Sequence, residues 1–338
     1  MDHPADRPTT ASKVVVPRQP RFSQTAAEGG ADRPLGPLSV LLMTVVCAVW
    51  GGAFVAIKIG LFYMPPFGSA AIRFFITSLV LLALARSRHV SLSCTRSETF
   101  IIAILAVFFC YWNFTTYVGT ALTTAGRATV FFYTQPIFLA VLAHYFLSGD
   151  HVTVRKIGGL ACALCGVAVL FLDKLQTGRS SAVLGDLLVL SGAIALAVQN
   201  LLIKKYAGKI HPVTLTLWGT LPASVLFGAV SWAVEHNVPF LFSAPAIASL
   251  LYLGFISTAF GFVAFAWLLQ RHPASRVTAL VFLTPVFGVL FGWAILHETL
   301  TPVQLLGVAG VCLGVYIVNS GAPPQVQEPL RKEATAGV

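Results

Sequence analysis

The sequence of 338 residues contains very little charge. Lys, Arg, Asp and Glu make up 10% of it, hydrophobic residues make up 57%, and the mean hydropathy is +0.82. A soluble globular domain has about 45–50% apolar and about 25% charged residues. The composition therefore excludes an ordinary water-soluble enzyme and indicates a chain whose main solvent is the lipid bilayer.

Chemistry-bearing groups are also scarce. None of the twelve acids lies near the centre of an apolar run, which leaves no buried carboxylate relay for protons. No Walker A motif, metal-ligand spacing or nucleophile–base pair is present, so we predict no ATP-driven pump, no metal and no cofactor. Cys162 and Cys165 form a C-x-x-C in a Gly- and Ala-rich run. We interpret them as small packing residues, with a metal or redox pair as the alternative.

The net charge of +10 invites a nucleic-acid partner, but the cations lie at the edges of apolar runs instead of on one face. We therefore predict none. Residues 1–36 and 321–338 are polar and read as flexible tails. The first tail has no hydrophobic segment with a cleavage site, so it is not a signal peptide.

Ten apolar runs fill the chain between the tails. They are continuous, which argues against the alternating pattern of a barrel, and their links are too short for a soluble domain. We predict an all-α integral membrane protein with ten transmembrane helices, at 38–60, 67–86, 99–121, 126–147, 156–173, 184–204, 213–234, 245–269, 277–297 and 302–319.

Lys and Arg near the ends of the runs predict the orientation. Three of these cations fall on one side, at Arg127, Lys174 and Arg179. Sixteen fall on the side of the N-terminus, namely Arg7, Lys13, Arg18, Arg21, Arg33, Arg86, Arg88, Arg96, Arg155, Lys156, Lys204, Lys205, Lys209, Arg271, Arg331 and Lys332. Since cytoplasmic loops are rich in Lys and Arg, we expect both termini in the cytoplasm and the chain in the cell (inner) membrane.

The sequence repeats itself across the middle. Residues 125–136 read AGRATVFFYTQP and residues 274–285 read ASRVTALVFLTP, followed in both copies by an acid and two glycines at matching spacing. Five spans separate the copies, and an odd number inverts the second copy in the membrane, as in many transporters. We predict two inverted five-helix repeats, at 37–175 and 182–320.

Four basic residues near or inside spans allow two interpretations each. Lys58 either reaches the headgroups or lies at a cavity mouth. Arg73, about 10 Å into its span, either binds carbonyls of a neighbouring helix or acts on substrate. Arg127 and Arg276 open the repeat-related fourth and ninth spans, as plain helix starts or as gates.

Gln135-Pro136 and Thr284-Pro285 lie in mid-span at equivalent repeat positions. Proline frees a carbonyl, so each kink is either bundle geometry or part of a polar mid-membrane site. Amides and aromatic residues in the spans are helix–helix or lipid contacts, or they line a cavity. As cavity candidates we take Trp50, Phe54, Arg73, Tyr111, Asn113, Tyr117, Tyr133, Gln135, Gln199, Asn200, Trp218, Thr258, Phe262, Phe282 and Thr284.

Several motifs together resemble the EamA-type family of the drug/metabolite transporter superfamily. They are Trp50–Lys58 followed by Pro65-Pro66, Ala71–Phe74, Thr123–Ala128 with Pro136, Ala274–Arg276 with Pro285, and Gly149-Asp150 and His297-Glu298. The resemblance covers about residues 38–320. It implies secondary transport through a central cavity lined by the first four helices of each repeat, with the fifth and tenth as scaffold. Leu196 stands where second repeats of the family often have Trp.

We therefore expect a secondary transporter, an exporter of small organic metabolites that are amino-acid-like, cationic or neutral amphiphiles. A nucleotide-sugar or sugar-phosphate exchanger is the alternative, but phosphate needs several cavity cations. A membrane-embedded enzyme should show paired acids or histidines in the membrane, and a receptor should show a soluble domain. Expected partners are a small-molecule substrate and the bilayer, and a homodimer is compatible with the sequence.

Overall fold

The structure is a computed structural model that describes residues 35–123, 125–147, 150–172, 182–208, 210–297 and 300–320, with only the backbone of Ala125 and Gly126. Most of both predicted tails, and the motif residues Gly149 and Glu298, lie outside these ranges.

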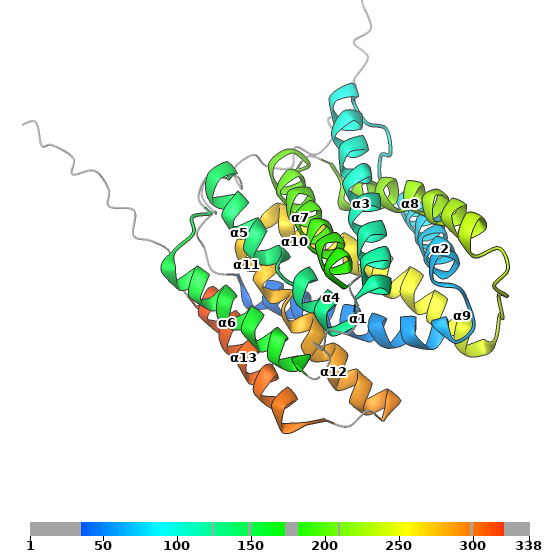
Figure 1. Cartoon of the computed structure of the whole chain (residues 1–338). Helices are drawn as coiled ribbons and strands as arrows, with labels where there is room; N and C mark the ends of the chain where they lie inside the picture. The colour runs from blue at the N-terminus through cyan, green and yellow to red at the C-terminus, as the bar shows by residue number, and fades with distance from the viewer. Residues whose placement is uncertain are drawn as a thin grey trace, which may run out of the picture.

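All regular structure in the described ranges is helical, in agreement with the predicted all-α membrane class (Figure 1). The elements are α1 (Pro37–Leu61), α2 (Pro66–Ser87), α3 (Arg96–Leu122), α4 (Ala125–Phe132), α5 (Gln135–Phe146), α6 (Val154–Leu170), α7 (Ala182–Tyr206), α8 (Pro212–Val234), α9 (Ala244–Leu251), η3 (Tyr252–Phe260), α10 (Gly261–Arg271), α11 (Ala274–Leu280), α12 (Leu283–Leu296) and α13 (Pro302–Asn319).

Nine helical segments of the described chain are long and apolar enough to cross a membrane. The tenth predicted span is α6, whose 17 residues are at the lower end of the about 17–25 that a crossing needs. The predicted spans begin and end within a few residues of these helices. What the hydropathy pattern misses is that the fourth, eighth and ninth spans are each built from more than one segment.

The helix ends fall on two sides of the molecule, which we call the near side, where α1 begins, and the far side, where α1 ends. If every span crosses, α10 ends near and α8 ends far. Ser39 at the start of α1 does contact His272 after α10, at 2.9 Å. Glu235 after α8 accepts hydrogen bonds from the backbone N–H groups of Phe67 and Gly68 at the start of α2. The contacts between connections therefore follow an alternating ten-span path.

The fourth and ninth spans are interrupted at equivalent points. In the fourth, α4 ends at Phe132 and α5 begins at Gln135, directly before Pro136. In the ninth, α11 ends at Leu280 and α12 begins at Leu283, with Pro285 in its first turn. The Thr134 N–H bonds the Phe131 carbonyl three residues back, so each break is a tight turn. Each proline thus coincides with a short interruption near the middle of its span, where the backbone stays right-handed and the hydrogen bonds run three residues back.

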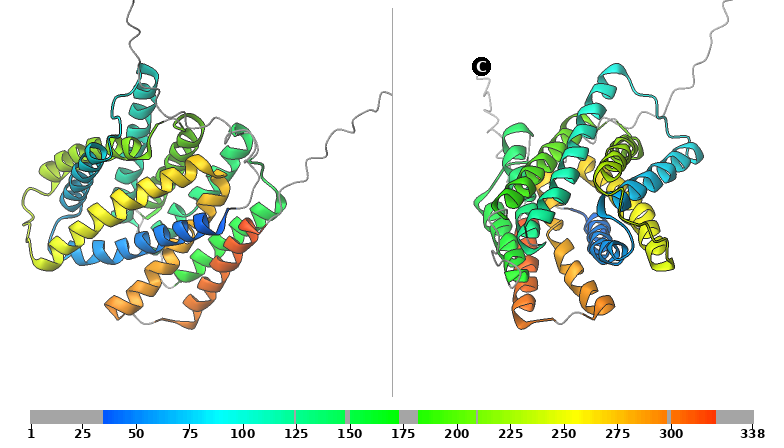
Figure 2. Two further views of the ribbon diagram at one scale, coloured as in Figure 1. Left: turned by 180° about the vertical axis from the view of Figure 1, so that it is seen from behind. Right: turned by 45° about the vertical axis from the view of Figure 1, so that its right-hand side comes forward.

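Helix contacts obey a two-fold exchange of the repeats. α2 packs along its repeat equivalent α8, and α6 packs along its equivalent α13. α3 packs on α7 in the way that α1 packs on α9, η3 and α10. The α6–α13 pair forms one edge of the bundle in every view (Figures 1 and 2).

Glycines allow the α6–α13 pair to approach closely. A Cβ atom added at Gly166 would lie 2.5 Å from the Val311 backbone nitrogen, and one at Gly314 would lie 2.3 Å from that of Ala163. The equally spaced Gly159 and Gly307 also face the opposite backbone. Cys162 lies in this interface, with its thiol 3.5 Å from the Gly310 carbonyl, and both Cys162 and Cys165 are free. The pair packs backbone against backbone, as small residues permit in lipid.

Candidate functional site

A central cavity of about 580 Å³ lies between the two repeats. Its walls come from α1 to α5, α7, α8, η3, α10, α12 and Val281, which are four spans of each repeat. No residue of α6 or α13 is among those that line it. The cavity reaches the far-side ends of three helices at Leu61, Pro66 and Ala121. Towards the near side its lining stops about one turn short of the helix ends, at Ile203 and Leu215.

Aromatic rings form a continuous apolar wall. The Phe109 ring lies 5.6 Å from Trp112 and 5.7 Å from Phe262, measured between ring centroids. Phe262 in turn lies 5.6 Å from Trp50, and Trp112 lies 5.9 Å from Phe132. These are the separations of favourable edge and tilted ring contacts. The five rings therefore contact one another in a continuous series, and all five border the cavity.

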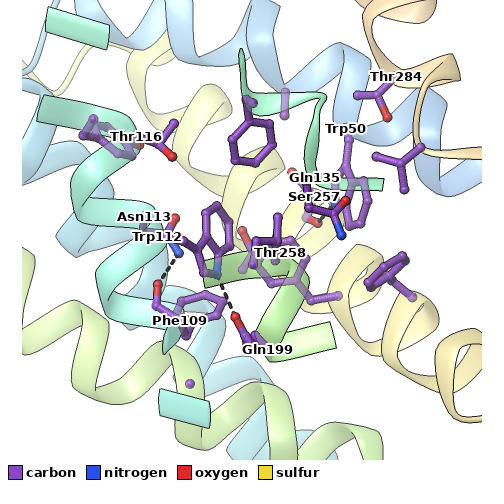
Figure 3. Close-up of a pocket in the computed structure, with 18 of the residues that line it drawn as sticks. Trp50, Phe109, Trp112, Asn113, Thr116, Gln135, Gln199, Ser257, Thr258 and Thr284 are labelled. Carbon is purple, nitrogen blue, oxygen red and sulfur yellow. Dashed lines mark hydrogen bonds between the residues drawn. The ribbon is translucent and has the colours of Figure 1, made fainter. Parts of the chain in front are cut away.

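The α3 wall carries polar groups among its aromatic residues. The Trp112 indole N–H donates to the Gln199 side-chain oxygen of α7 at 2.8 Å, and the Asn113 amide donates to the Phe109 carbonyl of its own helix at 2.8 Å (Figure 3). Each bond uses only one of the donors and acceptors of an amide side chain. Gln199 still offers its amino group and Asn113 its carbonyl oxygen.

The two interrupted spans each present a polar side chain to the cavity. Gln135 and Thr284 are 3% and 2% exposed. The Gln135 amino group has no hydrogen-bond partner in the described chain. The Thr284 hydroxyl lies beside Tyr133 and Cys47 without a hydrogen bond of standard geometry. A buried polar group without a hydrogen bond is energetically costly. The Gln135 amino group and the Thr284 hydroxyl can therefore form hydrogen bonds with a ligand or water in the cavity.

The Trp50-Gly51-Gly52 motif positions η3, the nine-residue π-helix of the eighth span. The Trp50 indole donates to the Ser257 carbonyl at 3.1 Å, and the Tyr252 hydroxyl donates to the Val49 carbonyl at 2.9 Å. A Cβ atom at Gly52 would lie 2.5 Å from that hydroxyl. η3 brings Ser257 and Thr258 to the cavity, and π-helical segments are frequent at functional sites.

Among the described residues that line the cavity, Arg73 is the one that carries a charge. It is 8% exposed, its guanidinium carbon lies 4.4 Å from the centroid of the Phe74 ring, and its Nε has no hydrogen-bond partner in the described chain. The cation therefore lies in an apolar, aromatic part of the wall.

A buried polar cluster joins the repeats on the near side. Asp150, between α5 and α6, is 3% exposed. It accepts hydrogen bonds from the Ser275 backbone N–H at 2.9 Å, from the Ser275 hydroxyl, and from the Lys156 ammonium at 2.9 Å. Ser275 belongs to the first turn of α11, so Asp150 of the first repeat binds the start of the ninth span. Nearby, Lys204 donates to the Gln270 carbonyl at 3.1 Å.

A far-side cluster joins α4 to α7. Arg127 forms an ion pair with Asp186, and the Thr123 hydroxyl donates to the same carboxylate at 2.7 Å. Both clusters lie at the ends of spans that wall the cavity.

Comparisons with known proteins identify the architecture. Residues 37–172 and 183–320 each match the EamA-like transporter family. The chain belongs to the EamA-like transporter family. This confirms the resemblance found in the motifs and, with the fold, identifies a multi-pass membrane transporter.

Relatives of this EamA-like transporter carry transporter names. The uncharacterized transporter YoaV of Bacillus subtilis is 30% identical over 84% of this chain and 95% of its own length. A probable amino-acid metabolite efflux pump of Escherichia coli is 31% identical over 82% of this chain and 93% of its own. A crystal structure with 17% identity superposes with a TM-score of 0.74 over 84% of this chain and 97% of that chain, which supports the fold alone.

Twelve of the fifteen predicted cavity residues of the EamA-like chain line the cavity. They are Trp50, Phe54, Arg73, Asn113, Tyr117, Tyr133, Gln135, Gln199, Asn200, Thr258, Phe262 and Thr284. Leu196, the departure from the family pattern, also lines it.

The other three lie elsewhere, and this corrects their prediction. Tyr111 is 46% exposed and its hydroxyl donates to Ser191 on the outside of the bundle. Trp218 is 38% exposed, because it is one residue before the cavity-lining Gly219 and points away from it. Phe282 is fully buried behind Tyr133, with the two rings 6.2 Å apart.

The predicted gate and kink residues are outside the lining. Lys58 is exposed in the last turn of α1. Arg127 lies in the far-side cluster, and Arg276 is 4% exposed in the first turn of α11. Pro136 and Pro285 directly follow Gln135 and Thr284 in the sequence, at the interruptions of the fourth and ninth spans.

Sequence reasoning missed a stripe on α3. Besides Asn113 and Tyr117, the lining includes Phe109, Trp112, Thr116 and Thr120. All six fall on one helix face at spacings of three or four residues, so extending the Asn113–Tyr117 pair by this period in both directions finds the others. No comparable signal exists for Ser257, since its position depends on the π-helix.

Proposed function

We propose that this EamA-like transporter exports small organic metabolites through the central cavity by alternating access. The observation that carries the proposal is the cavity itself. It is of ligand size, lies between repeats that are related by a two-fold exchange, and combines an apolar wall with uncharged polar groups.

The direction rests on the charge distribution. If the near side is cytoplasmic, as the excess of Lys and Arg there predicts, the cavity extends towards the outside and the Asp150 cluster joins the repeats at the inside. Alternation would then require that the contacts between Asp150 and Ser275 separate while a far-side closure forms.

The substrate class is proposed as amino-acid-sized metabolites with an apolar part. The Escherichia coli relative is named as an amino-acid metabolite efflux pump, which supports this size. A nucleotide-sugar or sugar-phosphate exchanger is less well supported, because a single cation lines the cavity and multiply charged phosphates are bound by several. We propose that the transporter is located in the cell membrane. That it forms a homodimer is a separate proposal, on which the transport function does not depend.

The test is transport by the purified full chain in proteoliposomes. Vesicles are loaded with a mixture of amino acids, amines and aromatic metabolites, and efflux is followed by mass spectrometry with and without a pH gradient. We expect selective efflux of some compounds without ATP. If loaded vesicles that contain correctly folded protein release every compound no faster than loaded vesicles without protein, the proposal is refuted.

A further inference from the structure

The cavity of this transporter contains a buried positive charge for which the described residues provide no counter-charge. Arg73 is about two turns into α2, and more than nine-tenths of its side chain is shielded from solvent. In the described chain its guanidinium forms neither an ion pair nor a hydrogen bond with another residue, and its contact is the face of the Phe74 ring. A buried cation is costly unless an anion, a hydrogen-bond acceptor or water solvates it. A cation kept inside a membrane span therefore points to a functional site.

No acid in the described chain is free to neutralise Arg73. None of the described residues that line the cavity is an Asp or a Glu. The four described acids bind other groups near the ends of helices: Glu98 caps α3 through Thr95, Asp150 binds Lys156 and Ser275, Asp186 binds Arg127, and Glu235 binds the start of α2. The described chain therefore supplies no counter-charge to Arg73, and its guanidinium borders the cavity, where a bound anion can reach it.

The surroundings of Arg73 define the rest of the ligand. The Phe74 ring that contacts the guanidinium lies 5.5 Å from Phe109, and Phe109 lies 5.7 Å from Phe262. An apolar body can therefore extend from the cation along the aromatic wall towards the centre of the cavity. Further along, the unpartnered Gln135 amino group and the Gln199 amide offer neutral hydrogen bonds.

We propose that Arg73 binds the carboxylate of the transported compound, which makes the substrate an organic monocarboxylate with an apolar or aromatic body. Guanidinium and carboxylate match in charge and in bidentate geometry. One cation suits one carboxylate and not a diphosphate. This proposal rests on the transport function proposed above, and it narrows the expected substrates, because cationic amphiphiles would be repelled by Arg73.

The experiment uses one carbon skeleton with three charges. Binding of 3-phenylpropionate, 3-phenylpropionamide and 3-phenylpropylamine to the purified full chain in nanodiscs is measured by isothermal titration. A charge-assisted pair in a buried site favours the anion over the neutral amide by about ten- to a hundred-fold in Kd. The amine should bind most weakly. Equal affinities, tighter binding of the amine, or no binding of the anion overturns the proposal without requiring any variant.

Two variants and a matched control locate the effect. Arg73→Gln should abolish the anion preference while the amide binds as before, and Arg73→Lys should keep part of it. Arg86→Gln removes an exposed charge near the other end of the same helix and should keep the full preference. A preference that persists in folded Arg73→Gln protein also overturns the proposal. Metabolite efflux in the proteoliposome assay, with no anion preference in the nanodiscs, would refute this inference and leave the proposed function standing.

Discussion

Gln135 and Thr284 occupy equivalent positions of the two repeats, one residue before the proline at each helix break. Both are buried and line the cavity. Because the Gln135 amino group has no partner in the described chain, its removal should cost the empty protein little. Its value should appear only when a ligand or water occupies the cavity.

We therefore expect Gln135→Ala and Thr284→Val to weaken transport by roughly two- to twelve-fold while membrane abundance stays near normal. Concentration dependence of efflux in proteoliposomes measures the effect. Leu313→Ala is the control, since Leu313 is 54% exposed on α13 and should alter neither quantity. Normal transport by both cavity variants would mean that these side chains do not contact the substrate.

At the scale of a helix pair, α6 and α13 depend on glycine at the contact points. Gly166→Ala would drive a methyl group into the backbone near Val311, where neither helix can yield without separating. Gly158 lies on the same helix with nothing within 4 Å of an added Cβ.

We expect Gly166→Ala to lower the free energy of unfolding by about 1–3 kcal/mol through overpacking. Gly158→Ala should be neutral or slightly stabilising, because alanine favours the helix. Thermal unfolding of the detergent-purified proteins compares the two. Equal melting temperatures for the two variants would show that the helix pair is not tightly packed in the bilayer.

The Asp150 cluster couples the link between α5 and α6 to the start of α11. Asp150→Asn replaces one acceptor oxygen by a donor that faces Ser275 and Lys156, and the loss of a charged hydrogen bond costs about 1.5–3 kcal/mol. We expect the near side to open more often. Labelling of Ile203→Cys by a membrane-impermeant thiol reagent from the near side should increase.

Glu98→Gln provides the control for this change. Glu98 is an acid at the near-side start of α3 and caps that helix, away from α11. The substitution Glu98→Gln should leave the labelling rate of Ile203→Cys unchanged. If Asp150→Asn also leaves this rate unchanged, the cluster does not restrain the near side.

The sequence patterns predict where the helices lie more accurately than they predict the interruptions within the helices. Hydropathy located the ten helical runs to within a few residues, since each run of apolar residues must be long enough to cross a bilayer. Proline marked the interruptions at Pro136 and Pro285 because it removes a helix hydrogen bond. The π-helix at Tyr252–Phe260 left no such mark, because its extra residue per turn depends on tertiary contacts such as the bond between Trp50 and Ser257. Tyr111 and Trp218 were misplaced because hydrophobicity does not distinguish a cavity-facing aromatic residue from a lipid-facing one.

For the whole molecule, the charge distribution and the ten-span path predict both termini in the cytoplasm. A reporter fused at Gly178, between the repeats, should report the outside, and one at Glu328 should report the cytoplasm. Both sites lie outside the described residues, so the fusions also probe parts of the chain that the structure leaves out. A cytoplasmic signal at Gly178 would contradict the inverted arrangement of the repeats.

Acid pH should weaken the near-side connections. The pKa of His272 lies below its ordinary value because of burial, and because the positive charges of Lys204 and Arg271 are close. The folded state then binds fewer protons than the unfolded state, so the free energy of unfolding falls as the pH drops from about 6.5 through the lowered pKa. His272 contacts Ser39 of α1, so protonation acts on a link between two spans.

The measurement is thermal stability of the purified chain between about pH 7.5 and pH 5. We expect His272→Gln to flatten the decrease of melting temperature on acidification. His89 is exposed near the end of α2, and His89→Gln should keep the decrease. Identical pH profiles for all three proteins would exclude His272 as the responsible group.

The π-helical segment of the eighth span sets the rotational phase between the two halves of one helix. α9 packs against α1 and α2, and the near-side half, α10, presents Phe262, Phe265 and Ala266 to the cavity. Each α-helical residue turns the chain by about 100°. One residue gained or lost within η3 would therefore rotate the cavity-facing residues of α10 relative to α9 by about that angle, with no substitution at any of them. In a related chain, an insertion or deletion at this one place would change several cavity-facing positions at once. A substitution changes one position at a time, so the length of η3 is a second way in which specificity can change.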